Sequence, residues 1–123
     1  MSPAPSNVIA VVDDDDDVRE VLCALFEVCG HEVEGYRSGS IFLQEAALNH
    51  VACLVLDLNM PEMTGLELVA ELDNRSLTIP TLLITGRATA SIRREALSSG
   101  VITVMQKPMC YQQLLRFVSL STN

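Results

Sequence analysis

The stretch "VIAVVDDDDDVRE", residues 8–20, joins a short apolar run to five consecutive aspartates and then to the start of a helical pattern. The run Val8–Val12 has the length and the continuous hydrophobicity of a strand buried on both faces. After the aspartates, apolar residues recur every three or four positions from Val18 to Cys29, which predicts an amphipathic helix. Runs of like charge are usually solvated tails. This one instead lies between a predicted strand and a predicted helix.

The same alternation of strand and helix continues along the chain. Further strands are predicted at His31–Tyr36, Ala52–Leu56, Pro80–Thr85 and Val101–Met105. Further helices are predicted from Ser38 or Ser40 to about Leu48, at Leu66–Leu72, at Thr89–Gly100, and from Tyr111 to about Leu120. Strands that alternate with helices require βαβ crossovers, so we expect an α/β fold, a three-layer α/β/α sandwich with a parallel sheet of five strands and five helices. One domain is expected at residues 8–121, after a flexible lead of residues 1–7.

Composition excludes several classes of protein. The 123 residues are 49% hydrophobic with a mean hydropathy of +0.30, which favours a folded core over disorder. The net charge of −8 disfavours direct nucleic-acid binding, which needs a basic face. No apolar stretch approaches the roughly 20 residues of a membrane span, so a soluble, cytoplasmic protein with no membrane contact is expected. The cysteines lack CxxC spacing and are predicted to be buried, reduced thiols: Cys23, Cys29, Cys53 and Cys110.

Polar side chains follow the predicted strands where a parallel sheet binds its ligands. Asp13 and Asp14 follow the first strand, Asp57 follows the third, Thr85 ends the fourth, and Lys107, the sole lysine, lies beyond the fifth. Clustered carboxylates repel unless a cation intervenes, and oxygen ligands favour Mg²⁺ or Mn²⁺. A lysine and a hydroxyl can both contact phosphoryl oxygens. Together these groups suit transfer of a phosphoryl group to an aspartate.

The other three aspartates have a simpler interpretation. Asp16 is predicted to cap the first helix, and Asp15 and Asp17 lie beside its positive end, where carboxylates are tolerated. A merely solvated acidic cap would account for these three residues. It would not account for the aspartate, threonine and lysine that the topology brings to the same edge of the sheet.

The ordered motifs "VDDD…VR", "LVLDLNMPEMTG", "LLITG" and "QKP" resemble the receiver domain of two-component response regulators, over residues 8–120. The resemblance implies a flavodoxin-like sheet with strand order 2-1-3-4-5. It implies that Asp57 is the phosphoacceptor, that Asp14 binds the metal directly and Asp13 largely through water, and that Asn59 supplies a backbone carbonyl to the metal. Thr85 matches the hydroxyl that moves toward the phosphoryl group.

The resemblance also implies a mode of action. It implies that Mg²⁺, with Mn²⁺ as the alternative cation, supports transfer from a phosphohistidine of a sensor histidine kinase or a phosphotransfer protein in a two-component or phosphorelay pathway, without independent substrate turnover. Lys107 matches the receiver lysine, and its bond to Pro108 is expected to be cis. Asn59 and Arg87 flank the site and are expected to tune hydrolysis of the phosphoryl group. A downstream effector is expected but not identified, and a homodimer is possible through the face formed by the fourth helix, fifth strand and fifth helix.

One departure from the receiver pattern leaves alternatives open. Receivers commonly carry Tyr or Phe three residues before the lysine, where this chain has Val104, a residue with a stiff χ1 and no ring. We expect phosphorylation to survive and its readout to change. The first alternative is a pseudo-receiver that binds partners without phosphorylation. The second is a small phosphatase of the haloacid-dehalogenase type using Asp13 and Asp15, which the absence of any carboxylate after Lys107 disfavours.

Overall fold

A computed structural model of the chain, which describes residues 7–122, contains one parallel sheet of five strands. The strands are ordered β2-β1-β3-β4-β5, which confirms the predicted topology. They comprise β1 (Val8–Val12), β2 (Glu32–Tyr36), β3 (Val51–Asp57), β4 (Thr81–Thr85) and β5 (Thr103–Gln106). The first and third strands are neighbours, with Val12 opposite Leu56, so the residues that follow them emerge side by side.

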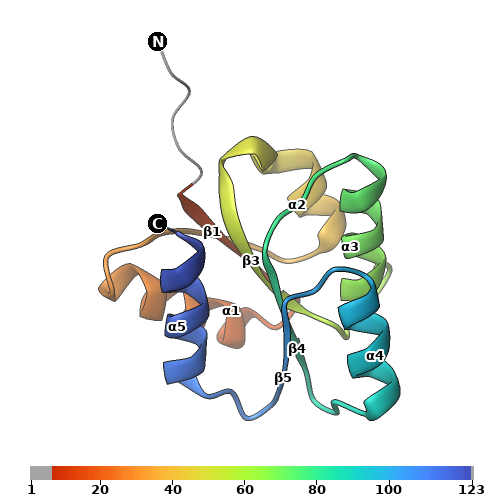
Figure 1. Cartoon of the computed structure of the whole chain (residues 1–123). Coiled ribbons are helices and arrows are strands. Elements are labelled where there is room, and N and C mark those ends of the chain that lie inside the picture. The colour runs from red at the N-terminus through yellow and green to blue at the C-terminus, as the bar shows by residue number, and fades with distance from the viewer. Residues whose placement is uncertain (1–6, 123) are drawn as a thin grey trace.

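Helices cover both faces of the sheet, as the alternation of elements predicts (Figure 1). The helices are α1 (Asp16–Val28), α2 (Gly39–Glu45), α3 (Gly65–Asn74), α4 (Ala90–Ser98) and α5 (Tyr111–Ser121), with a short 3-10 turn η1 (Leu48–His50) before β3. Leu22 and Phe26 of α1 and Leu114 of α5 pack in one apolar cluster on one face. Phe42 of α2, Leu68 of α3 and Ala96 of α4 belong to the cluster on the other face.

Helix α1 begins one residue earlier than the cap prediction required. Asp15, not Asp16, is the N-cap, and its Oδ1 accepts hydrogen bonds from the backbone N–H of Asp17 (2.9 Å) and of Val18 (3.1 Å). The Asp13 carboxylate accepts the N–H of Asp15 at 2.9 Å and so shapes the turn that leaves Asp15 in the extended conformation a cap needs. Asp16 becomes the first helical residue and forms an ion pair with Arg19.

Other boundaries also differ from prediction; β5, for example, begins at Thr103 and not at Val101. Helix α2, capped by Ser38, ends at Glu45 rather than near Leu48, because Ala46 adopts an extended conformation that starts the approach to β3. Helix α3 is longer than predicted, because Thr64 and Glu67 form a reciprocal capping box at its start. The glycine after that cap, Gly65, is buried, and a Cβ there would lie 2.7 Å from the backbone oxygen of Asp57. The close approach of α3 to the end of β3 therefore depends on this glycine.

The predicted burial of all four cysteines is wrong for two of them. All four are free thiols; Cys53 is buried within β3 and Cys23 is half-buried, but Cys29 and Cys110 are exposed. Cys29 follows the last residue of α1 and Cys110 precedes the first of α5, so both leave the packed faces of their helices.

Two predictions concern the ends and the environment of the chain. Residues 1–6 of the predicted lead lie outside the described residues, and the domain limits of residues 8–121 stay a prediction. Within residues 7–122, no helix is long and apolar enough to cross a membrane.

Candidate functional site

Three of the predicted site carboxylates meet at the carboxyl end of the sheet. Asp13 and Asp14 follow β1, and Asp57 is the last residue of the adjacent β3. Carboxylate oxygens of all three residues lie within 4.8 Å of one another. Asp13 and Asp57 are buried, whereas Asp14 is exposed. The acidic pocket formed by these three residues thus contains two buried carboxylates and one that is exposed to solvent.

The pocket raises the pKa of its buried carboxyl groups. Burial, followed by the negative charge of Asp13, raises the pKa of Asp57 to about 6, although Lys107 and the backbone N–H of Asn59 act in the opposite direction. Burial likewise raises the pKa of Asp13, against a hydrogen bond from Asp15 and the charge of Lys107. The charge of Lys107 does not offset the desolvation and mutual repulsion of these groups, whereas a bound divalent cation would lower their pKa values.

One buried oxygen lacks a partner among the described residues. Asp13 Oδ1 accepts the N–H of Asp15, but Asp13 Oδ2 is buried and has no hydrogen-bond partner. A buried carboxylate oxygen without a partner is costly, so its presence beside two other carboxylates fits a site that holds a cation. The ligands are all oxygen atoms, as hard divalent cations prefer.

Lys107, in the loop after β5, and Thr85, at the end of β4, lie at the same end of the sheet as Asp57. Lys107 Nζ lies 3.8 Å from Asp57 Oδ1, and the Lys107 side chain is 35% exposed. Thr85, buried at the end of β4, accepts hydrogen bonds through Oγ1 from Asn59 Nδ2 (3.4 Å) and from the backbone N–H of Arg87 (3.2 Å). The backbone N–H of Lys107 donates to the Thr85 carbonyl at 2.9 Å, and the Lys107–Pro108 peptide bond is cis.

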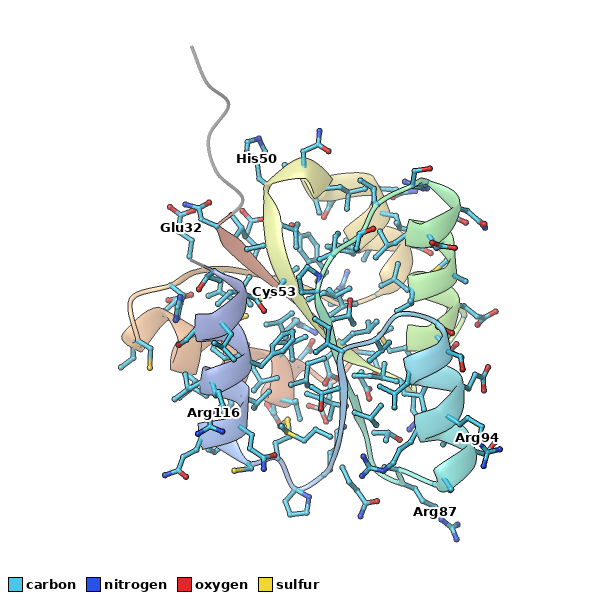
Figure 2. The ribbon with its side chains drawn as sticks, in the orientation of Figure 1. Glu32, His50, Cys53, Arg87, Arg94 and Arg116 are labelled. Carbon is cyan, nitrogen blue, oxygen red and sulfur yellow. The ribbon has the colours of Figure 1, made fainter. Side chains whose placement is uncertain are left out.

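Asn59 and Arg87 contact the site differently: Asn59 through both its backbone and its side chain, and Arg87 through its backbone alone. The backbone N–H of Asn59 lies 3.4 Å from Asp57 Oδ1. The Arg87 guanidinium instead projects outward from the loop between β4 and α4, so only the backbone of this residue reaches Thr85 (Figure 2). The contribution of the Asn59 carbonyl to a metal stays a prediction.

Val104 is buried within β5 and packs in the same apolar cluster as Ala96 of α4. Its backbone carbonyl accepts a hydrogen bond from Arg93 Nη1 at 3.2 Å. Ala88 and Ile92 are among the partly buried side chains that pack against the same cluster. A valine cannot swing between two positions as an aromatic side chain can.

Sequence reasoning missed two polar residues at this end of the sheet. Gln106 Oε1 accepts the backbone N–H of Ala88 at 2.9 Å and so ties β5 to the loop between β4 and α4. Arg19 Nη1 donates to the backbone carbonyl of Asp13 at 2.8 Å. The position of Gln106 next to Lys107 in the sequence did not indicate that its side chain would bind the backbone N–H of Ala88. The spacing of three residues between Asp16 and Arg19 is a signal from which a helical ion pair could have been predicted, but not the contact with Asp13.

Comparisons with known proteins agree with this geometry. The sequence profile described as "Response regulator receiver domain" matches residues 9–119. The chain is 34% identical to response regulator protein TodT of Pseudomonas putida over 110 residues, covering 89% of this chain and 48% of that protein. It is 33% identical to transcriptional regulatory protein FixJ of Rhizobium meliloti over 100 residues, covering 81% and 49%. The chain therefore spans about half the length of the curated relatives it matches.

Solved structures show the same arrangement of elements. The response regulator StyR superposes with a TM-score of 0.86 at 36% identity, covering 94% of this chain and 58% of that one. The structure of FixJ-N gives a TM-score of 0.85 at 28% identity, covering 97% and 95%. Chemotaxis protein CheY4 of Vibrio cholerae gives 0.85 at 26% identity, covering 96% and 99%.

Proposed function

This chain belongs to the response regulator receiver domain family, and we propose that it accepts a phosphoryl group from a phosphohistidine onto Asp57 and thereby changes its affinity for a partner. A receiver domain is not an independent catalytic enzyme, so the relevant chemistry is its own phosphorylation and dephosphorylation. The observation that carries the proposal is the buried Asp57 carboxylate, which lies 3.8 Å from the sole lysine and clusters with Asp13, whose buried Oδ2 has no hydrogen-bond partner.

Asp57 has the properties of a nucleophile that works with a cation. With a pKa of about 6, its carboxylate is mostly ionised at neutral pH and can attack phosphorus to form an acyl phosphate. Asp13, Asp14 and Asp57 would hold Mg²⁺, with the Asn59 carbonyl as a further ligand. When bound, this ion would neutralise the charge of the pocket and of the phosphoryl oxygens. Mn²⁺ fits the same oxygen ligands.

Lys107 and Thr85 would take up the charge of the transferred group. The Lys107 ammonium already lies next to an Asp57 oxygen and can reach a phosphoryl oxygen attached there. The Thr85 hydroxyl donates to the Arg87 carbonyl at 3.4 Å. It must turn away from that carbonyl to donate to the phosphoryl group. Phosphorylation thereby competes for a hydroxyl that also holds the loop before α4, which would link the chemistry to a surface change.

The partner of this reaction follows from the family and from the surface beside the pocket. Receiver domains partner with histidine kinases, and we propose a kinase or phosphotransfer protein as the donor. A groove between the starts of α1 and α5 is lined by Asp17, Val18, Val21, Met109 and Tyr111, and Val21 is 50% and Tyr111 47% exposed. This largely apolar surface, which includes Met109 two residues after Lys107, supports docking of a donor. We further propose that the protein acts in the cytoplasm. Its phosphorylated form would bind a downstream effector or form a homodimer through α4, β5 and α5.

A pseudo-receiver that binds partners without phosphorylation is the second candidate, because Val104 lacks the ring that usually accompanies the threonine. The phosphatase alternative is wrong: the family is that of receivers, and the Asp15 carboxylate that the phosphatase would need caps α1 instead.

The proposal is tested by incubating the protein with acetyl phosphate and Mg²⁺ and measuring its intact mass. One phosphoryl adduct is expected, and it should be absent with Asp57→Asn and after chelation of the metal. Asp73→Asn, which removes an exposed carboxylate on α3, is the matched control and should retain the adduct. Mg²⁺ binding without any adduct on the wild-type protein would favour the pseudo-receiver.

A further inference from the structure

Arg19 of α1 donates to the backbone of the turn that carries Asp13 and Asp14, through its contact with the Asp13 carbonyl. We propose that Arg19 is a positioning residue for cation binding, which acts by fixing the backbone of Asp13 while the Asp16 carboxylate holds its guanidinium in place. This inference rests on the proposed function, because it assigns to Arg19 a role in the metal-dependent step of that function.

The Arg19 side chain is half-buried and makes two directed contacts. Nη1 donates to the Asp13 carbonyl at 2.8 Å, and Nη2 pairs with the Asp16 carboxylate. The Arg19 side chain is 14% exposed, whereas that of Arg75, which forms a comparable helical ion pair with Glu71, is 44% exposed. The planar fork of arginine suits a carbonyl and a carboxylate held at fixed positions. Arg19 is thus part of the packed structure and not a solvated surface charge.

The hydrocarbon stem of Arg19 is held by the edge of the sheet. A Cβ at Gly35 of β2 would lie 3.1 Å from Arg19 Cδ, from Arg19 Cγ and from Cys23 Sγ. Gly35 pairs with Val11 in the ladder, so the strand beside β1 provides the space in which this stem lies. The side chain is therefore restrained along its length, and few rotamers can satisfy its contacts.

The two contacts of Arg19 act on the conformation of the acidic turn and leave the pocket carboxylates free. The Asp13 N–H donates to the Tyr36 carbonyl at 3.1 Å and the Asp13 carbonyl accepts from Arg19, so the backbone of Asp13 is held on both sides. Its carboxylate then enters the pocket with Oδ2 unpaired. In the described structure, Arg19 donates to the Asp13 carbonyl and to the Asp16 carboxylate, and not to the carboxylates of Asp14 or Asp57.

Positioning and simple electrostatics predict opposite results when Arg19 is removed. Loss of a positive charge near three carboxylates should, by Coulomb's law alone, tighten the binding of a divalent cation. Loss of a residue that orients a ligand should weaken it, since removing groups that orient metal ligands typically costs 10- to 100-fold in affinity. The sign of the change therefore separates the two roles.

The test is a titration of wild type, Arg19→Met and Arg75→Met with Mg²⁺, followed by the amide NMR shifts of residues 13–17. Arg19→Met keeps an apolar stem and removes both contacts, and Arg75→Met removes an arginine and an ion pair far from the pocket. We expect the Mg²⁺ dissociation constant to rise about tenfold for Arg19→Met and to stay unchanged for Arg75→Met. In acetyl phosphate reactions, the Mg²⁺ requirement should rise in parallel while the maximal rate is recovered at high Mg²⁺.

A second pair of variants keeps the test decisive if Arg19→Met does not fold. Asp16 is 70% exposed, so Asp16→Asn should fold, and it removes the charge of the ion pair and so loosens the second contact of the guanidinium. Asp17→Asn removes the same charge one residue further along and leaves both contacts of Arg19 intact. The inference requires Asp16→Asn to weaken Mg²⁺ binding more than Asp17→Asn does. Equal weakening by these two, or unchanged or tighter binding by folded Arg19→Met, would overturn it. Failure of the wild type both to bind Mg²⁺ and to form the adduct would overturn the proposed function itself.

Discussion

Replacing Asp57 with asparagine is expected to stabilise the metal-free protein at neutral pH, although it abolishes the proposed chemistry. The Asp57 side chain is 5% exposed, and its pKa is raised from 3.8 to about 6. In the unfolded chain this carboxyl group loses its proton near pH 4, while the folded protein retains the proton until about pH 6. As pH rises through this window the unfolded state binds fewer protons than the folded state, so stability falls.

The size of the effect follows from the width of that window. At about 1.4 kcal/mol per pH unit, the difference between the two pKa values corresponds to about 3 kcal/mol. This is an upper value, because asparagine must also bury a polar group at the same position. A gain of about 1–3 kcal/mol at pH 7 is therefore expected for Asp57→Asn in the presence of a chelator. Below pH 4 the folded wild-type carboxyl group is protonated, and the advantage should nearly disappear.

Urea unfolding followed by circular dichroism measures this difference in the free energy of unfolding. Both proteins should give the same dependence on urea, about 1–3 kcal/mol per molar, so the gain appears as a shift of the midpoint. Added Mg²⁺ should stabilise the wild type by mass action and narrow the gap at pH 7, since the substituted pocket has lost a ligand. Equal stabilities at pH 7 without metal, or a gap of the same size at pH 4, would refute the reasoning.

Three further predictions concern residues around the site. Gly65→Ala places a methyl group 2.7 Å from the carbonyl at the end of β3, and thermal denaturation should show destabilisation well above the roughly 1 kcal/mol of a typical substitution; a neutral effect would mean that α3 shifts freely. Gln106→Ala removes the 2.9 Å acceptor of the Ala88 N–H, so hydrogen exchange of that amide should accelerate while the adduct still forms; unchanged exchange would show that the loop is held elsewhere. A thiol reagent should modify Cys29 and Cys110 rapidly and Cys53, buried within β3, only on unfolding; rapid modification of Cys53 in the native protein would contradict the described burial.

The sheet and the acidic edge were predictable because they depend on patterns that span several residues. The run Val8–Val12 forms β1 with the predicted limits, and the alternation of strands and helices was sufficient to predict a parallel sheet. Given that topology, Asp13, Asp14 and Asp57 had to meet, because residues that follow adjacent parallel strands emerge at one edge. Such features tolerate errors of one or two residues.

Features that depend on a single residue were not predictable in the same way. Asp15 and Asp16 are chemically equivalent caps, and the choice between them is made by the Asp13 carboxylate, which bonds the N–H of Asp15. Gln106 meets Ala88 only because β5 lies beside the loop that follows β4, a contact between residues 18 positions apart. The exposure of Cys29 likewise depends on where α1 ends, which an apolar pattern locates only approximately.

The measurement that tests the central claim most directly is the location of the phosphoryl group. After reaction with acetyl phosphate and Mg²⁺, borohydride reduction of the acyl phosphate and peptide mapping by mass spectrometry identify the modified residue. We predict a single modified residue, Asp57 at the end of β3. Modification of Asp13 instead, or of no aspartate under conditions in which a known receiver is labelled, would contradict the account.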